Sequence, residues 1–157
     1  MNLDQLNDEI KSDLETRYLL FNIDDMVYGV SLVLALEILT VQIATKIPNT
    51  NEALKGIINL RGKVVPVVDV RIKFGLEELE YTDKTCIIVL ELDGMQIGLI
   101  VDSVREVATI NESDMSNPPN GSGFSNKFLS SVTEVDGKIV LNIDFKRFFQ
   151  DEIGSLI

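Results

Sequence analysis

Three aspartates are the side chains of this sequence best placed for acid–base chemistry. Asp69, Asp102 and Asp144 each stand where an apolar run ends, and two carboxylates facing each other across a cleft would suit a hydrolase. Asp69 and Asp144 also occupy matching positions of an internal repeat, described below. A carboxylate at such a position can cap the following turn by accepting backbone N–H groups, which favours a structural role. A carboxylate-dependent hydrolase that uses Asp69 or Asp102 is therefore the weaker hypothesis.

The other common catalytic and metal-binding patterns are missing from the sequence. There is no histidine, which removes the commonest general base and any Ser–His or Cys–His pair. The single cysteine, Cys86, can supply neither a zinc site nor an internal disulfide. Asp24 and Asp25 lack the regular spacing of a calcium-binding loop, and no phosphate-binding glycine motif occurs. The sequence therefore predicts no enzymatic activity, no cofactor and no metal site.

One arginine stands apart from the apolar runs around it. The stretch Ile57–Phe74, IINLRGKVVPVVDVRIKF, is typical of two strands joined by a tight corner at Asn59–Gly62. Arg61 at this corner is held away from the fold rather than packed into it. Pro66 in the second run predicts a sheet edge or a bulge, because proline cannot donate a ladder hydrogen bond. We predict that the corner is the working end of a protein-binding module.

The composition narrows the class of protein further. With 157 residues and 45% apolar side chains, the chain can bury a core as one domain or two very small ones. The net charge of -11 argues against a surface for nucleic acid or for an anionic membrane. No apolar run approaches the ~18 residues of a membrane span, and no signal peptide is evident. A cytoplasmic protein without direct membrane insertion is expected.

The first sixteen residues differ in pattern from the rest. Leu3, Leu6, Ile10 and Leu14 recur at helical spacing among acidic residues. Residues 1–16 are therefore expected to form a short amphipathic helix or a loosely docked tail.

The remainder of the chain repeats itself. A shift of 69 positions places Tyr18–Gly29 on Ile87–Gly98, and a shift of 75 places Arg61–Phe74 on Asp136–Phe149. The loop at Ser113–Asn126 absorbs the difference, because its prolines and glycines tolerate insertion. Each half holds about five short strand-like runs, as a small closed β-barrel requires. An all-β protein with two related barrels, in approximate halves 17–75 and 84–149, is predicted.

The two halves differ at the corner and share a possible groove. Arg61 corresponds to Asp136, a reversal of charge that suggests one specialised corner, although exposed turns also drift freely. Apolar residues near the seam between the halves flank two acids, Glu37 and Glu106. They would either line a groove that holds a partner helix or form the core between the barrels.

The corner NLRG with KVVPVVDVRIKFG, preceded by ALKGI and YGVSLVLALEIL, resembles the CheW-like chemotaxis coupling proteins. IGLIVDSVREV and KIVLNID resemble the second half of the same family, so the resemblance covers Arg17–Phe149. It implies two SH3-like five-stranded β-barrels with short helical turns and with strands partly exchanged between them. Residues 150–157 are then expected to be a C-terminal tail.

The resemblance also implies a function. Proteins of this family are scaffolds that link the histidine kinase CheA, through its regulatory domain, to the cytoplasmic tips of methyl-accepting chemoreceptors, at the inner face of the membrane. The receptor's helical tip docks between the barrels. The kinase contacts are not assigned, and an adaptor of a non-chemotactic array, for surface motility or development, is the alternative. Carried over residue by residue, the receptor-binding set is Ala35, Glu37, Ile38, Arg61, Gly62, Cys86, Gly98, Val104 and Val107.

Two positions depart from the family pattern. The position of Ala35 commonly holds a larger aliphatic residue, so a contact there is expected to be weaker. Ser131 replaces a glycine that is usual in the second half, which affects the backbone conformation expected at that corner.

Overall fold

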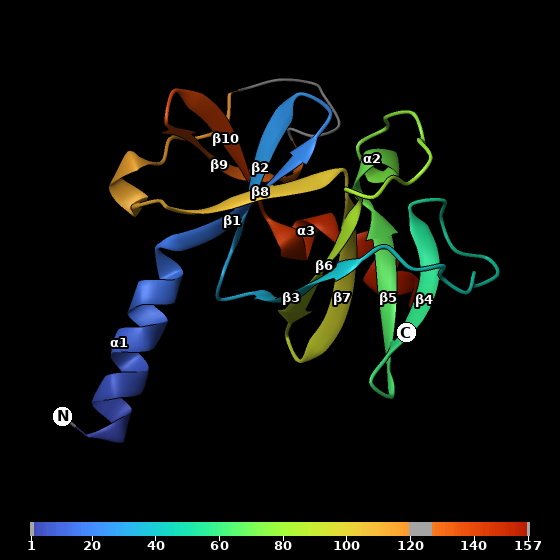
Figure 1. Cartoon of the computed structure of the whole chain (residues 1–157), viewed down its shortest axis with the longest axis horizontal. Helices are drawn as coiled ribbons and strands as arrows, with labels where there is room; N and C mark the ends of the chain where they lie inside the picture. Colours follow the sequence, from blue (N-terminus) through green and yellow to red (C-terminus); the bar gives the residue numbers. More distant parts are fainter. Residues whose placement is uncertain (1, 120–126, 157) are drawn as a thin grey trace.

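The computed structural model, which describes residues 2–119 and 127–156, consists of two five-stranded sheets with short helices around them (Figure 1). We call the sheets barrel 1 and barrel 2. Barrel 1 has the strand order β8 (Ser103–Thr109), β1 (Arg17–Ile23), β2 (Met26–Ser31), β10 (Lys138–Ile143), β9 (Leu129–Val135). Barrel 2 has the order β3 (Ala35–Thr40), β6 (Cys86–Leu92), β7 (Met95–Val101), β5 (Lys63–Asp69), β4 (Leu54–Leu60).

The strand orders of the two barrels correspond through the internal repeat. The shift of 69 carries β1 and β2 onto β6 and β7, and the shift of 75 carries β4 and β5 onto β9 and β10. Each barrel combines strands from both halves of the chain: barrel 1 takes β8, β9 and β10 from the second half, and barrel 2 takes β3, β4 and β5 from the first. The exchange of strands that the resemblance implied is therefore present, with one parallel pair in each barrel, β10 with β2 and β5 with β7.

Each barrel is closed by a short bridge between its two outer strands. In barrel 2 the chain after β3 returns to β4, where Thr45 and Ile57 exchange two backbone hydrogen bonds of 2.8 and 2.9 Å. In barrel 1 the chain after β8 does the same at β9, where Ser116 and Val132 exchange bonds of 2.8 and 2.9 Å. These bridges satisfy edge groups that an open sheet would leave unpaired.

The alternation of side chains along the strands produces three cores. In β6, Ile88 and Leu90 face the other barrel, whereas Ile87 and Val89 fill the interior of barrel 2. The largest core lies between the barrels and draws on both sheets, including Phe21 of β1. Neither barrel alone could cover this surface, so the two fold as one unit.

Pro66 was predicted to lie at a sheet edge or a bulge, and it lies at neither. The strand β5 lies between β4 and β7, and the irregularity in the pairing of β4 with β5 falls between Leu54 and Gly56, whereas Pro66 pairs with Ile57. Its partner in β4, Ile57, uses its N–H and C=O for the bridge to Thr45 and so makes no bond to Pro66. The missing N–H of Pro66 therefore faces β7, where the parallel ladder begins only at Val67. A proline is tolerated one residue before that ladder.

Short helices follow the last strand of each half. Asp69 caps α2 (Val70–Lys73), accepting from the N–H groups of Arg71 and Ile72, and Asp144 caps α3 (Phe145–Phe148). The expected tail at 150–157 instead forms α4 (Gln150–Leu156), packed close after α3. A short 3-10 turn, η1 (Glu112–Asp114), lies in the long loop, of which residues 120–126 fall outside the described part of the chain.

The amino-terminal segment forms the helix α1 (Leu3–Glu15), which projects from barrel 1 (Figure 1). Its start is fixed by a capping box between Asn2 and Gln5, and none of its residues is buried. Within the described residues, no helix has the length and apolar character needed to cross a membrane.

Candidate functional site

The corner that carries Arg61 is a hairpin turn between β4 and β5. Arg61 and Gly62 both have positive φ, +50° and +85°, and the side chain of Asn59 accepts a 2.9 Å hydrogen bond from the N–H of Gly62. The matching hairpin of barrel 1 places Asp136 at φ +49°. Aspartate tolerates this left-handed conformation better than arginine does, so Arg61 is held there against its local preference.

The guanidinium of Arg61 reaches the carboxylate of Glu37, with which it forms an ion pair. Glu37 lies on β3 and Arg61 follows β4, the two outer strands of barrel 2, so the pair spans the line where that barrel closes. The Arg61 side chain is nevertheless 70% exposed, and its remaining donors face solvent. The structure thus brings the two charged members of the predicted set together on the surface.

The apolar members of the predicted set lie on the faces that the two sheets turn toward each other. Their cross-strand partners, among them Ile88, Leu90, Leu19 and Phe21, belong to the inter-barrel core. The residues concerned are Ala35, Ile38 and Cys86 in barrel 2 and Val104 and Val107 in barrel 1.

These five residues divide by exposure. Ile38 is 46% exposed and Val107 is 50% exposed, so each presents an apolar side chain to solvent beside the seam. Ala35, Cys86 and Val104 are half-buried and pack against the inter-barrel core. Three members of the predicted set therefore contribute to the core between the barrels, and the other two remain on the surface.

The thiol of Cys86 has low reactivity for two reasons. Burial raises the pKa of its thiol, which donates a hydrogen bond to the carbonyl of Lys84 at 3.2 Å. A raised pKa means less thiolate at neutral pH and therefore low reactivity. This favours packing over a redox role.

Gly62 and Gly98 occupy different environments. Gly62 is exposed in the hairpin turn, with open space where a Cβ would stand. Gly98 is buried in β7, and a Cβ there would lie 2.8 Å from both Ile87 and Val67. Gly98 therefore lets β5, β6 and β7 approach closely and offers no side chain to a partner.

The aspartates considered for catalysis have structural partners. Asp69 and Asp144 are the caps of α2 and α3, and Tyr81 donates a 3.1 Å hydrogen bond to Asp69. Burial raises the pKa of Asp69, although the donors of Ile72, Tyr81 and Arg71 oppose the shift. Among the described residues, no group of three or more acidic or thiol side chains is arranged to hold a metal ion.

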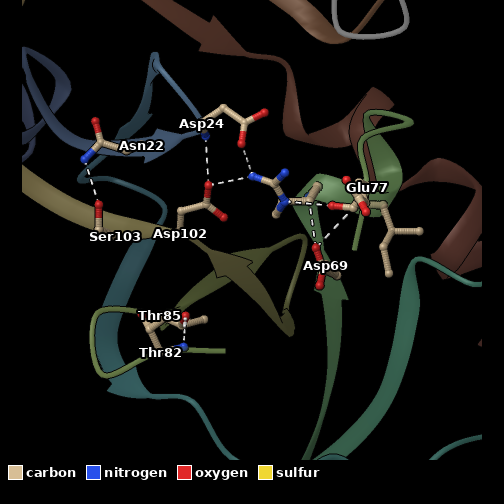
Figure 2. A network of polar contacts seen from close by, with 10 residues as sticks. Asn22, Asp24, Asp69, Glu77, Thr82, Thr85, Asp102 and Ser103 are labelled. Carbon is tan, nitrogen blue, oxygen red and sulfur yellow. Dashed lines mark hydrogen bonds and ion pairs between the residues drawn. The ribbon is translucent and has the colours of Figure 1, made fainter. Parts of the chain in front are cut away.

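Asp102 belongs to a polar network that the sequence did not reveal (Figure 2). Arg71 of α2 is only 8% exposed, and its guanidinium binds the carboxylates of Asp24 and Asp102, the latter at 2.8 Å. Its Nε donates to the carbonyl of Glu77 at 2.9 Å, and Asp102 also accepts the backbone N–H of Asp24 at 2.8 Å. Burial alone would lower the pKa of Arg71, and the two carboxylates more than offset this.

This network joins the two barrels, because Asp24 lies in the β1–β2 turn and Asp102 between β7 and β8. The repeat shifts carry Asp24 and Arg71 onto Asp93 and Lys146, which form a looser, exposed pair at 3.6 Å. The guanidinium of Arg71 is therefore buried, whereas the ammonium at the equivalent position of the repeat is exposed.

A second buried pair fixes the carboxyl-terminal helix. Glu152 of α4 is completely buried, and its two oxygens accept hydrogen bonds from Lys73 at 2.7 and 2.9 Å. The Lys73 ammonium also lies 5.3 Å from the centre of the Phe128 ring. Neither residue stands in a sequence pattern that would have revealed the contact.

The comparisons with known proteins agree with this geometry. The profile of the CheW-like domain family matches residues 17–152. The chemotaxis protein CheW of Bacillus subtilis (strain 168) is 34% identical over 105 residues, which cover 67% of each chain. CheW of Klebsiella aerogenes is 26% identical over 141 residues, covering 89% of this chain and 85% of that protein. Protein FrzA of Myxococcus xanthus is 26% identical over 123 residues, covering 78% and 77%.

A solved structure matches as well. The crystal structure of the scaffolding protein TtCheW from Thermoanaerobacter tengcongensis superimposes with a TM-score of 0.79 and 32% identity, covering 86% of this chain and 88% of that one. The shared architecture confirms the predicted pair of five-stranded barrels. With a family match that spans both barrels and a solved scaffold of the same fold, this chain belongs to the CheW-like domain family.

Proposed function

We propose that this chain is a non-enzymatic scaffold of chemotaxis signalling, which couples a histidine kinase of the CheA type to the cytoplasmic tips of methyl-accepting chemoreceptors. The observation that carries the proposal is the family match over both barrels, together with the fold of a scaffolding protein. The protein would work in the cytoplasm and reach the inner face of the membrane through its receptors. No residue is assigned to the kinase contact.

We assign the receptor contact to the surface around Arg61 and the seam. Glu37 restrains the Arg61 guanidinium, which lowers the entropy lost when a partner binds it. Ile38 and Val107 supply exposed apolar area on either side of the inter-barrel core. A receptor helix would lay its apolar face on these two residues and set its register against the arginine.

The roles of the aspartates support a non-enzymatic reading. Asp69 and Asp144 are occupied as helix caps, and Asp102 is paired with Arg71. A hydrolase using Asp69 or Asp102 would need these carboxylates free to face a substrate. Turnover that disappears in Asp69→Asn would be required to revive that hypothesis.

The test is co-sedimentation of the full chain with a CheA-type kinase and a receptor cytoplasmic fragment. Arg61→Asp should weaken receptor binding by about 2 kcal/mol, or ~30-fold, as expected for an arginine at the centre of a contact. Asp136→Arg is the matched control, because it reverses the charge of the equivalent hairpin of barrel 1. It should leave receptor binding unchanged.

The outcomes separate the possibilities. Equal binding by the wild type and a folded Arg61→Asp variant would contradict the assignment of the receptor surface. Retention of neither kinase nor receptor by the wild type would contradict the scaffold function itself. A different kinase recovered with the chain would favour a non-chemotactic array.

A further inference from the structure

One polar side chain inside barrel 1 carries an atom that no other group of the described chain satisfies. Asn142 of β10 is only 3% exposed, and its Nδ2 donates to the hydroxyl of Ser131 at 2.9 Å and reaches that of Thr133 at 3.5 Å. Its Oδ1 is the one buried side-chain nitrogen or oxygen of the described residues without a hydrogen-bond partner. A buried polar atom left unpaired reduces the equilibrium constant for folding by roughly 10- to 100-fold.

Neither a water molecule nor a rotation of the amide satisfies this atom. A Cβ placed on Gly29, which pairs with Asn142 across the ladder, would lie 2.6 Å from Oδ1 and 3.3 Å from Val140, so the space there does not admit even a methyl group. A buried water needs such room and several polar partners. Rotating the amide would give the oxygen two hydroxyl donors, but it would place the Nδ2 donors in the same apolar surroundings. One polar group of Asn142 therefore stays unpaired in either orientation.

The equivalent positions of barrel 2 are apolar. The shift of 75 carries Val67 onto Asn142 and Ile58 onto Thr133, and both aliphatic side chains belong to the buried interior of barrel 2. Because burial of apolar area stabilises a fold, β9 and β10 gain less from packing on barrel 1 than β4 and β5 gain on barrel 2. The buried apolar residues inside barrel 1 are Leu20, Val27, Ile110 and Val140.

Asn142 lies where the β9–β10 hairpin joins the rest of barrel 1. In the strand order, the described part of this hairpin is held on β8, β1 and β2 by the parallel ladder of β10 with β2 (Figure 1). This ladder is short: it runs from Val140 to Asn142, and Asn142 pairs with Gly29 at its end. On its other side the hairpin is held by the bridge from Ser116 to Val132. The unpaired atom thus weakens a joint that already has few hydrogen bonds.

The two ends of the hairpin are held differently. At one end, Leu129 and Ile143 are buried in the core between the barrels. At the other end, the corner at Asp136 is exposed, and the nearby side chain of Ile139 is 50% exposed. The corner can therefore move outward while the end next to α3 stays in place.

We propose that the β9–β10 hairpin is a flap, which opens barrel 1 while barrel 2 stays closed, and that Asn142 and Thr133 set this difference. Opening breaks the short parallel ladder and gives Asn142 water as a partner, so the open state recovers the hydrogen bond that the closed state lacks. It also frees the backbone edge of β2, which is paired with β10 in the closed barrel. The matching hairpin, β4–β5, has Val67 and Ile58 at these positions and opens more rarely.

Residue-resolved hydrogen exchange of the full chain tests the flap, because the protection of each amide reports the population of open states. Amides of β9 and β10 near the corner should be roughly 10- to 100-fold less protected than the equivalent amides of β4 and β5. Equal protection of the two hairpins would overturn the proposal.

A stabilising variant separates the flap from a general weakness of the fold. Asn142→Val/Thr133→Val makes both interior positions apolar and β-branched, as they are in barrel 2. It should raise the protection of β9 and β10 by about 10-fold or more and leave that of β4 and β5 unchanged. Ile139→Val, at an exposed position of the same hairpin, is the control and should change neither.

The reverse change should transfer the weakness to barrel 2. Val67→Thr adds a hydroxyl to the apolar interior of that barrel, so it should lower the protection of β4 and β5 several-fold and leave β9 and β10 unchanged. Circular dichroism checks that every variant keeps the fold.

The remaining outcomes would each overturn the proposal. Unchanged or lower protection of β9 and β10 in Asn142→Val/Thr133→Val would show that the amide is satisfied in the closed barrel. A rise shared equally by all strands would show that the hairpin opens only when the whole protein unfolds. A Val67→Thr effect that is the same in both hairpins would lead to that conclusion too.

Discussion

Removing Arg71 tests whether the buried tie between the barrels stabilises the fold. Arg71→Met keeps the apolar length of the side chain and deletes its charge. The change removes hydrogen bonds to Asp24, to Asp102 at 2.8 Å and to the carbonyl of Glu77 at 2.9 Å. It leaves the carboxylate of Asp24 and the carbonyl of Glu77 without the Arg71 donor, whereas Asp102 keeps its hydrogen bond from the backbone N–H of Asp24.

The expected loss of stability depends on how exposed the carboxylates of Asp24 and Asp102 are. Removing one partner of a fully buried pair costs about 3–5 kcal/mol. The side chains of Asp24 and Asp102 are 46% and 29% exposed, so water recovers part of the loss. We expect Arg71→Met to lower the free energy of unfolding by about 2–3 kcal/mol, or the melting temperature by roughly 5–10 °C.

The repeat supplies a matched control in Lys146, which corresponds to Arg71. Its pair with Asp93 spans 3.6 Å, and both side chains are more than 70% exposed, so Lys146→Met should change stability by less than ~0.5 kcal/mol. The assay is urea unfolding followed by circular dichroism, because urea leaves ionic strength unchanged. Equal losses in the two variants would refute the reasoning, as would an Arg71→Met effect that disappears when salt is added.

Three further predictions concern packing, pH and the carboxyl-terminal helix. Gly98→Ala should cost about 1–3 kcal/mol in urea unfolding because the strands around it cannot separate, whereas Gly154→Ala, with open space in α4, should stabilise by roughly 0.5–1 kcal/mol. Burial raises the pKa of Asp69 above its ordinary 3.8. The folded protein therefore holds that proton where the unfolded chain has lost it, and this contribution to stability falls as pH rises through the window. Asp69→Asn removes the effect, so its stability relative to the wild type should increase as the pH rises above about 4; a constant difference would contradict this. Glu152→Ala leaves the buried Lys73 with only the exposed carboxylate of Asp151, at 3.6 Å, as a counter-ion, and should cost about 2–3 kcal/mol by thermal or urea unfolding. A loss no larger than that of an exposed ion pair would show that the pair of Glu152 and Lys73 contributes little.

Local patterns were enough to predict the barrels. The strand-like runs, their glycine corners and the aspartate caps at Asp69 and Asp144 are set by neighbouring residues, and each appears in the structure as predicted. The repeat added the equivalence of the halves, which the strand orders reproduce. The ion pair of Arg61 and Glu37 joins residues that the resemblance had placed on one surface.

Contacts between distant parts of the chain were beyond the reach of sequence patterns. Arg71 is 47 residues from Asp24 and 31 from Asp102, and they meet only because strands are exchanged between the barrels. Glu152 is buried by a lysine 79 residues away, so the segment around it looked like a tail. The position of Pro66 was predicted wrongly, because the sequence does not show where the pairing with the neighbouring strand begins. The parallel hydrogen-bond ladder between β5 and β7 starts at Val67, one residue after the proline, so an inner strand can hold it.

Differences between equivalent positions indicate where the molecule has been specialised. Two hairpins of the same shape place Arg61 and Asp136 at nearly the same left-handed φ. In this conformation arginine destabilises the folded state by about 1 kcal/mol relative to aspartate or glycine. The exposed ion pair with Glu37 stabilises it by less than ~1 kcal/mol, so it does not offset this cost. The fold alone would therefore favour aspartate at residue 61. Arg61→Asp should leave stability unchanged or slightly higher while it weakens binding, and a variant that lost both together would show that the arginine serves the fold rather than a partner.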